Sequence, residues 1–393
     1  MTRADVIVIG GGANGTSTAF HLASRGVRNV LLLERRQLGA GATGKSGSLV
    51  RMHYTNEPES RLAFESLKIF RDFPNVVGGD CGFEPTGFLQ IVPRGYEAAL
   101  ARNVARQQRL GIATETVTPD RLTELLPGCR IDDVGAAAWE PESGFADPNA
   151  TTFAFAEAAR RLGATIETGC EVTRIKTERG RVVGVETAQG RIEAPVVVLV
   201  PGAWAAPLLA PLGLDFGLVP HRIQVTIFRW PAGFKSRHCA VIDAIHQSWF
   251  RPEGTATTLI GVELGAGHAE PDALVEGVDP EFVVTCRNAL AGRLPAMRDA
   301  TMRGGWAGMI MMSADSRPII DQIPSIVGLY CMLGDSGTSF KTSPAIGKCL
   351  AEWIVDGKPR TVDLTPFRST RFTEGLPWHD DDNYGGQGLT ISR

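Results

Sequence analysis

The chain has 393 residues, too many for one compact core, so about two or three domains are expected. Its 40 basic and 43 acidic residues leave a net charge of −3, which argues against a nucleic-acid partner and against attraction to an anionic membrane. The seven cysteines include no C-x-x-C pair, which argues against a disulfide framework, a zinc ribbon or an iron–sulfur cluster. We therefore expect a cytoplasmic protein with no metal site and no membrane span.

The N-terminal segment predicts a parallel βαβ unit. Residues 5–10 are a β-branched run that ends in glycine, and residues 30–33 form a second apolar strand. Between them, residues 13–25 place apolar side chains along one side of a helix. A strand, a glycine turn, a helix and a strand within about 30 residues have the size of such a unit.

Further elements follow in a mixed order. The expected helices are 57–70, 97–110, 151–162 and 344–354. The expected strands are 88–92, 165–168, 171–177, 181–187, 191–193, 196–200 and 326–333. Residues 219–264 alternate in the manner of an antiparallel sheet, and the polar segment from 369 onward is expected to pack loosely. This order predicts a mixed α/β chain, in which one domain is assembled from separated stretches and a second is inserted between them.

The glycine turn after the first strand carries a dinucleotide-binding pattern. Gly10-Gly-Gly12-Ala-Asn-Gly15 fits G-x-G-x-x-G between a strand and a helix, so a pyrophosphate is expected at the helix N-terminus. Glu34 ends the second strand, where its carboxylate can accept hydrogen bonds from ribose hydroxyls. Residues 39–44 match the same spacing but lack the flanking strand and helix, so we do not interpret them as a second dinucleotide-binding motif.

Three features favour FAD over NAD. The loop 39–48 is rich in Gly, Ser and Thr, whose N–H groups and hydroxyls suit a diphosphate and a flavin ring. Val196–Gly202 repeats the form of an apolar strand followed by glycine, and Leu333–Gly337 supplies a third glycine turn before the last helix. The chain has no second credible G-x-G-x-x-G module for NADPH, so a pyridine-nucleotide disulfide reductase is not expected.

Together these segments resemble the FAD-dependent D-amino-acid oxidase superfamily, in particular its sarcosine oxidase and glycine oxidase branch. The matching pieces span almost the whole chain in the family's order: Val6–Gly15 with Glu34 and Arg35, Gly41–Arg51, Asp147–Ala164, Val196–Trp204, Ser313–Pro318 and Gly334–Pro344. The resemblance implies a Rossmann-like FAD-binding domain with an inserted substrate domain that carries an antiparallel or mixed sheet. The expected FAD-binding domain comprises 1–85, 146–219 and 315–368, the substrate domain 86–145 and 220–314, and the tail 369–393.

The resemblance also implies the site residues. In similar sarcosine oxidases an Arg of the loop after the glutamate and the Lys of the closing motif hold the substrate carboxylate, and these are Arg51 and Lys341 here. His53, Glu263 and His268 are further catalytic candidates from their places in the sequence. The residues expected to bind FAD are Gly10, Gly12, Ala13, Asn14, Gly15, Glu34, Arg35, Gly41, Thr43, Gly47, Ser48, Leu49, Val172, Gly202, Trp204, Gly334, Gly337, Thr338, Ser339, Phe340 and Lys341.

The chain departs from its relatives at three places. Relatives with covalent flavin carry a Cys shortly before a Thr-Pro-Asp motif; residues 307–312 contain none, so non-covalent FAD is expected. Ser313-Ala-Asp315 replaces that motif, a mild change. Relatives that react quickly with oxygen often carry a Lys where this chain has Glu263, and a carboxylate there opposes developing superoxide. This favours a dehydrogenase that passes electrons to a quinone, a flavoprotein or a partner subunit over an oxidase that uses oxygen.

The expected reaction is oxidation of the C–N bond of a small amino acid or N-alkyl (secondary) amino acid to an imine, by hydride transfer to flavin. One alternative is a FAD-dependent 2-hydroxy-acid dehydrogenase, which needs a base such as His53 or His268. Another is the flavin subunit of a multi-subunit amine or opine dehydrogenase that is inactive alone, and both homo- and hetero-oligomers stay open. Residues 246–251 are a candidate pocket wall, but an aromatic such as Trp249 in antiparallel sheet favours a core position.

Overall fold

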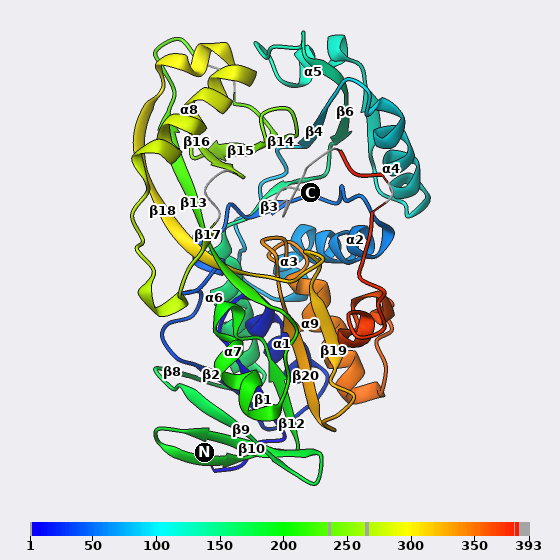
Figure 1. Cartoon of the computed structure of the whole chain (residues 1–393), viewed down its shortest axis with the longest axis vertical. Helices are drawn as coiled ribbons and strands as arrows, with labels where there is room; N and C mark the ends of the chain where they lie inside the picture. The colour runs from blue at the N-terminus through cyan, green and yellow to red at the C-terminus, as the bar shows by residue number, and fades with distance from the viewer. Residues whose placement is uncertain (1, 235–236, 264–266, 381, 385–393) are drawn as a thin grey trace.

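A six-stranded sheet is built around the N-terminal strand β1 (Val6–Ile9), in the lower half of Figure 1. The computed structural model describes residues 2–234, 237–263, 267–380 and 382–384. Neighbouring strands are parallel except for β19, which pairs antiparallel with β20 at one edge. The order is β19 (Ile319–Gln322), β20 (Leu329–Leu333), β12 (Val196–Leu199), β1, β2 (Val30–Glu34) and β8 (Thr165–Thr168).

Both faces of this sheet are covered, which explains why its central strands β1, β12 and β20 are apolar runs. Val6 and Val8 share one core with a layer of helices, and Ile7 and Ile9 share another with a small sheet and a short helix. The helical layer consists of α1 (Ala13–Ser24), α6 (Pro148–Arg161) and α9 (Ser343–Asp356). The other face is covered by β9 (Val172–Glu178), β10 (Arg181–Thr187), β11 (Gly190–Glu193) and α7 (Ala206–Leu209).

A second, nine-stranded sheet occupies the upper half of Figure 1. Its pairs are antiparallel except for β14 and β4, which run parallel. The order is β17 (Gly267–His268), β13 (Val219–Arg229), β16 (Thr257–Val262), β15 (Ser248–Glu253), β14 (Ala240–Asp243), β4 (Phe88–Pro93), β6 (Val134–Glu140) and β5 (Glu115–Val117), with β18 (Thr301–Met312) paired to β13. Helices that pack on it are α8 (Pro280–Arg293), α4 (Glu97–Arg109) and α5 (Pro119–Leu125).

The remaining elements lie where the two sheets meet. Helix α2 (Glu57–Arg71) contacts α9 and α4, and α3 (Phe73–Val76) follows it. A short ribbon of β3 (Leu49–Val50) and β7 (Gly144–Phe145) joins the glycine-rich loop to the chain that leaves β6. Within the described part of the chain, no helix has the length and apolar character needed to cross a membrane.

The mixed α/β architecture and its inserted mixed sheet confirm the fold class expected from the sequence. Several elements of the inserted part were not predicted, among them β6, α8 and β18. Strand β18 was missed because Gly304, Gly305 and Gly308 interrupt it, and glycine weakens the strand pattern. It is held instead by its long antiparallel pairing with β13.

The expectation that the polar segment from 369 onward packs loosely was wrong for part of its described residues, although residues 373–376 are exposed. Arg371 is 1% exposed and donates two hydrogen bonds to the Asp315 carboxylate, at 2.7 and 2.9 Å. The backbone N–H of Trp378 donates to the same carboxylate at 3.0 Å. Polarity misled the prediction because these charged side chains are paired with buried partners and are not solvated.

Candidate cofactor and active site

The turn between β1 and α1 is shaped by its glycines. Gly10 has a φ of 114°, and a Cβ on Gly15 would lie 1.9 Å from the Gly10 carbonyl oxygen. The Glu34 carboxylate fixes the turn by accepting hydrogen bonds from the N–H groups of Gly11 and Arg36, both at 2.7 Å. The N-terminus of α1 is therefore close to the end of β2, in the arrangement that binds a pyrophosphate.

A cavity of about 370 Å³ lies at the carboxyl ends of β1, β2 and β12, and we call it the cofactor cavity. Among the described residues, Asn14 Oδ1 is buried without a hydrogen-bond partner, which suits a site that receives a polar ligand. The cavity is lined by 9–15, 33–36, 40–43, 170–173, 200–202, Trp204, Pro207, Leu208, Asp272 and 332–335.

A second cavity of about 120 Å³ adjoins the first, and we call it the substrate cavity. The two share Ala13, Asn14, Ala42, Thr43 and Asp335. The other lining residues of the substrate cavity are 46–49, Arg51, 223–225, Ile242, Trp249, Val262, Glu263, Ile310, Gly337 and 339–341. Because they share a wall, a long ligand in the cofactor cavity can reach the substrate cavity.

Two cations line the substrate cavity from opposite ends of the sequence. Arg51 is 2% exposed and Lys341 is 7% exposed. The Arg51 guanidinium carbon lies 4.5 Å from the centre of the Tyr54 ring, and Lys341 Nζ lies 5.3 Å from it. Burial, and then the charge of Arg51, hold the pKa of Lys341 well below its usual value. Neither cation forms an ion pair with an acidic side chain in the described parts of the chain, so both are available to an anionic ligand.

Comparison with known proteins decides the family. The family described as FAD dependent oxidoreductase matches residues 5–353. The chain belongs to this family of FAD-dependent oxidoreductases. Members of this family bind FAD, which identifies the cofactor for the glycine turn. The ADP part of FAD suits the cofactor cavity, and the flavin would supply redox chemistry when bound.

This FAD-dependent oxidoreductase is similar to several named proteins. It is 28% identical to the sarcosine oxidase subunit beta of Arthrobacter sp, over 97% of this chain and 93% of that one. It is 25% identical to the mitochondrial dimethylglycine dehydrogenase of Rattus norvegicus, but spans only 45% of that protein. The crystal structure of L-proline dehydrogenase from P. horikoshii superposes with a TM-score of 0.88 at 28% identity, over 95% of this chain and 98% of that one.

The residues expected to bind FAD lie where the sequence places them, with one exception. All except Thr338 line the cofactor cavity or the substrate cavity. Thr338 is not among the lining residues, and its carbonyl oxygen accepts a hydrogen bond from Lys341 Nζ at 3.0 Å.

The two histidines expected near the chemistry do not line the substrate cavity. The buried ring of His53 points to Tyr384, with Nε2 2.6 Å from the hydroxyl. His268 is exposed on β17, opposite His221 of β13. Glu263, by contrast, lines the cavity.

Sequence reasoning missed several cavity residues. Asp335 lines both cavities, and burial raises the pKa of its carboxyl to about 6. Its position inside the glycine motif at 334–337 was the available signal. Trp249 also lines the substrate cavity, although its place in an antiparallel strand favoured the core. Its ring contacts Gly47 so closely that a Cβ there would lie 2.1 Å away.

A surface segment, 270–279, reaches from the nine-stranded sheet to the cofactor cavity, and we call it the clasp. Asp272 Oδ1 accepts hydrogen bonds from Trp204 Nε1 at 2.8 Å and from Arg35 Nη2 at 2.9 Å. Glu276 pairs with Lys45 Nζ at 2.7 Å. Because Asp272, Trp204 and Arg35 all line the cofactor cavity, the clasp closes part of that cavity with polar links.

Proposed function

We propose that this FAD-dependent oxidoreductase oxidises the C–N bond of a small amino acid or N-alkyl amino acid to an imine. The observation that carries the proposal is the pair of buried cations, Arg51 and Lys341, in a small cavity that shares a wall with the cofactor cavity. A guanidinium binds a carboxylate through two hydrogen bonds and an ammonium adds a point charge, so the pair suits an amino acid's carboxylate.

Each residue has a role in this proposal. Arg51 and Lys341 hold the carboxylate, and Trp249 and Ile242 supply apolar wall around a short side chain or N-alkyl group. Bound FAD would supply the redox chemistry, as the acceptor of the hydride released from the carbon next to nitrogen. A primary or secondary amine would also lose its N–H proton and give an imine, a tertiary amine would give an iminium, and water would hydrolyse either product. Relatives named for sarcosine, dimethylglycine and proline support a small secondary or tertiary amine.

The electron acceptor follows from Glu263. A cation near reduced flavin favours superoxide formation, and a carboxylate on the cavity wall opposes it. We therefore infer a dehydrogenase, whose acceptor is a quinone or a partner flavoprotein, over an oxidase that uses oxygen. The absence of Cys from 307–312 supports non-covalent FAD.

An anaerobic substrate panel tests the proposal. N-methyl amino acids, proline, glycine and 2-hydroxy acids are mixed with the holoprotein, and loss of flavin absorbance is followed. We expect bleaching by amino acids, a raised half-saturating substrate concentration for the bleaching rate in Arg51→Ala and Lys341→Ala, and no change in the exposed control Lys358→Ala. Bleaching only by hydroxy acids would overturn the proposal; the two histidines considered as bases for that chemistry lie off the cavity.

A second candidate function is that of a FAD-carrying subunit that works only with partner chains. It is favoured by three relatives named as the beta subunit of sarcosine oxidase, from Arthrobacter sp, Rhodobacter capsulatus and Rhizobium meliloti. Its signature is bleaching of the isolated chain by substrate without turnover with any small acceptor. Steady turnover of the purified chain with a quinone or with oxygen would contradict it.

A further inference from the structure

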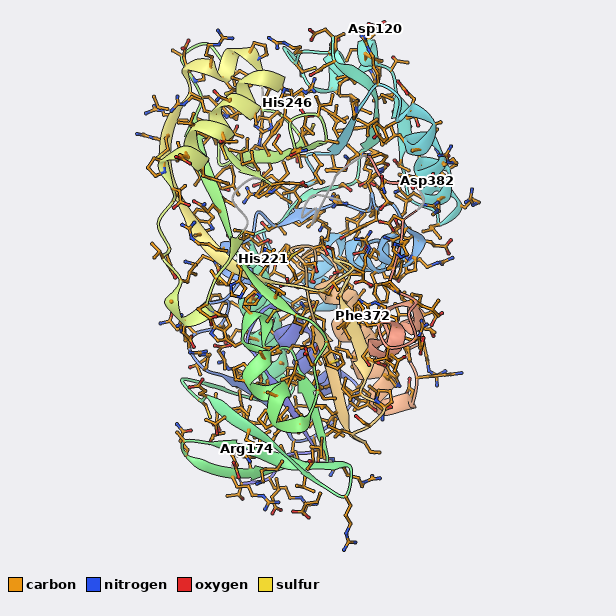
Figure 2. All side chains as sticks on the ribbon, in the orientation of Figure 1. Asp120, Arg174, His221, His246, Phe372 and Asp382 are labelled. Carbon is orange, nitrogen blue, oxygen red and sulfur yellow. The ribbon has the colours of Figure 1, made fainter. Side chains whose placement is uncertain are left out.

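The end of the described chain lies against the loop that carries Arg51. In Figure 1 the red segment runs from the region beside β19 to α4, and Figure 2 places the labelled Asp382 beside that helix. The Asp382 carboxylate pairs with Arg102 at 2.7 Å and with Arg106 at 2.9 Å. Asn103 Nδ2 donates to the Asp382 carbonyl oxygen at 2.9 Å. One face of α4 therefore fixes this end of the chain.

A second set of links lies just upstream. The Asp380 carboxylate accepts a hydrogen bond from Thr55 Oγ1 at 2.5 Å and forms an ion pair with Arg317. Arg317 is 3% exposed and also lies 3.0 Å from the Glu59 carboxylate. Separating a buried ion pair leaves each charge without compensation, so breaking the contact between Arg317 and these carboxylates is energetically costly. They tie the segment to the chain at 55–59, directly after the Arg51 loop.

Two residues beyond Asp382, Tyr384 is hydrogen-bonded to His53. Asn103 Nδ2 donates to the Tyr384 hydroxyl oxygen at 2.8 Å, and the same hydroxyl lies 2.6 Å from His53 Nε2. Burial, and then the charge of Arg51, lower the pKa of His53 to about 3, which keeps the ring neutral and able to accept. The two rings also stack, with centres 5.9 Å apart.

His53 connects this hydrogen bond to the substrate cavity. Its carbonyl oxygen accepts a hydrogen bond from Arg51 Nη1, the guanidinium that lines the cavity. The neighbouring Met52 N–H donates to buried Glu140 at 3.0 Å, which holds the other side of the same loop. His53 is thus held through its ring by Tyr384, and it holds Arg51 through its backbone.

We propose that Tyr384 is a positioning residue for Arg51, and that residues 378–380 and 382–384 orient the guanidinium for a carboxylate ligand. The inference rests on the proposed function, because it takes Arg51 as the carboxylate anchor. A two-point contact between guanidinium and carboxylate depends on orientation as well as on charge. Loss of the Tyr384 hydroxyl therefore weakens carboxylate binding without removing a charge from the cavity.

Acetate and its uncharged isostere acetamide test this. Binding to the FAD-loaded protein is measured from the perturbation of the flavin spectrum, in wild type, Arg51→Lys, Tyr384→Phe and the control Tyr330→Phe. Tyr330 carries the same substitution on β20, where it packs on Trp353. Tyr384→Phe keeps the ring that packs beside Val92 and Leu100, so folding is preserved, which FAD content verifies.

We expect Tyr384→Phe to weaken acetate binding about three- to tenfold, as loss of one buried hydrogen bond behind the anchor predicts, and to leave acetamide unchanged. Tyr330→Phe matches wild type for both. Equal losses for acetate and acetamide in Tyr384→Phe indicate a general structural role and overturn the proposal. The proposal is also overturned if Tyr384→Phe binds acetate as tightly as wild type while Arg51→Lys binds it more weakly. If Arg51→Lys also binds acetate normally, the proposed anchor fails together with the inference.

Discussion

Lys341 Nζ and the Arg51 guanidinium share one aromatic neighbour: they lie 5.3 and 4.5 Å from the centre of the Tyr54 ring. Burial, and then the charge of Arg51, depress the pKa of Lys341 well below 10.5. A carboxylate that arrives between the two cations favours the protonated lysine. Ligand binding is therefore coupled to proton uptake, and carboxylate affinity rises as pH falls from 10.5 toward the depressed pKa.

Calorimetry of acetate binding in two buffers of different ionisation enthalpy measures this uptake. We expect wild type to take up a proton on binding in this pH range, and Lys341→Met to take up none. Lys358→Met serves as the exposed control and keeps the wild-type uptake. Equal heats in the two buffers for wild type would show that acetate binding does not change the protonation of Lys341, which would contradict the coupling.

The clasp predicts how tightly FAD is retained. Asp272 links the segment 270–279 to Trp204 and Arg35, and these links are exposed, so salt screens them. We expect Asp272→Asn to speed FAD dissociation severalfold. Exposed ion pairs and hydrogen bonds of this kind contribute about 0.5–1 kcal/mol, which corresponds to such a change in rate. The variant's rate should depend less on ionic strength than that of wild type.

Recovery of flavin fluorescence after dilution gives this rate. Asp299→Asn, an exposed carboxylate on the 3-10 helix that follows α8, is the matched control and should keep the wild-type rate and salt dependence. A wild-type dissociation rate in Asp272→Asn would mean that the clasp does not limit FAD release.

The glycine turns and the charged anchors were predictable because their roles are local or carried by a motif. Gly15 must be glycine wherever a helix packs this closely on the preceding turn, and its spacing from Gly10 shows this in the sequence. Lys341 was found through the motif at 334–344, and Arg51 through its place after Glu34. Both line the substrate cavity as expected. Their role as carboxylate anchors stays a prediction, as do the domain limits.

What the sequence could not show is contact between residues far apart in the chain. His53 and Tyr384 are 331 positions apart, and no local pattern pairs them. The same holds for Asp315 and Arg371, so buried ion pairs looked like a solvated polar tail. Likewise His268 was placed by its nearness to Glu263 in sequence, whereas pairing of β17 with β13 leaves it exposed.

Asp335 predicts a pH-dependent flavin potential. Its carboxyl lines both cavities, and burial raises its pKa to about 6. Above that pH its negative charge disfavours addition of electrons to nearby FAD, so Asp335→Asn should raise the midpoint potential. Below that pH the wild-type carboxyl is neutral, and the two proteins should converge. Redox titrations at pH 5 and pH 8 measure this, with Asp299→Asn as control; an equal difference at both pH values would assign it to packing.

Glu140 predicts the pH dependence of stability. It is 0% exposed, and burial raises the pKa of its carboxyl from 4.5 to about 7 although Met52 N–H and Ser143 Oγ donate to it. Between these two pKa values the folded state binds more protons than the unfolded state, so stability falls as pH rises from about 4.5 to about 7. A shift of this size contributes on the order of 1–3 kcal/mol.

Glu140→Gln should remove that component, because the amide cannot ionise. Denaturant unfolding at pH 5 and pH 7.5 measures it: the variant should lose less unfolding free energy across this range than wild type. Glu157→Gln, on the exposed side of α6, is the matched control and should keep the wild-type slope. Parallel pH profiles for wild type and Glu140→Gln would mean that Glu140 is ionised in the folded protein, stabilised there by the nearby Arg51 charge.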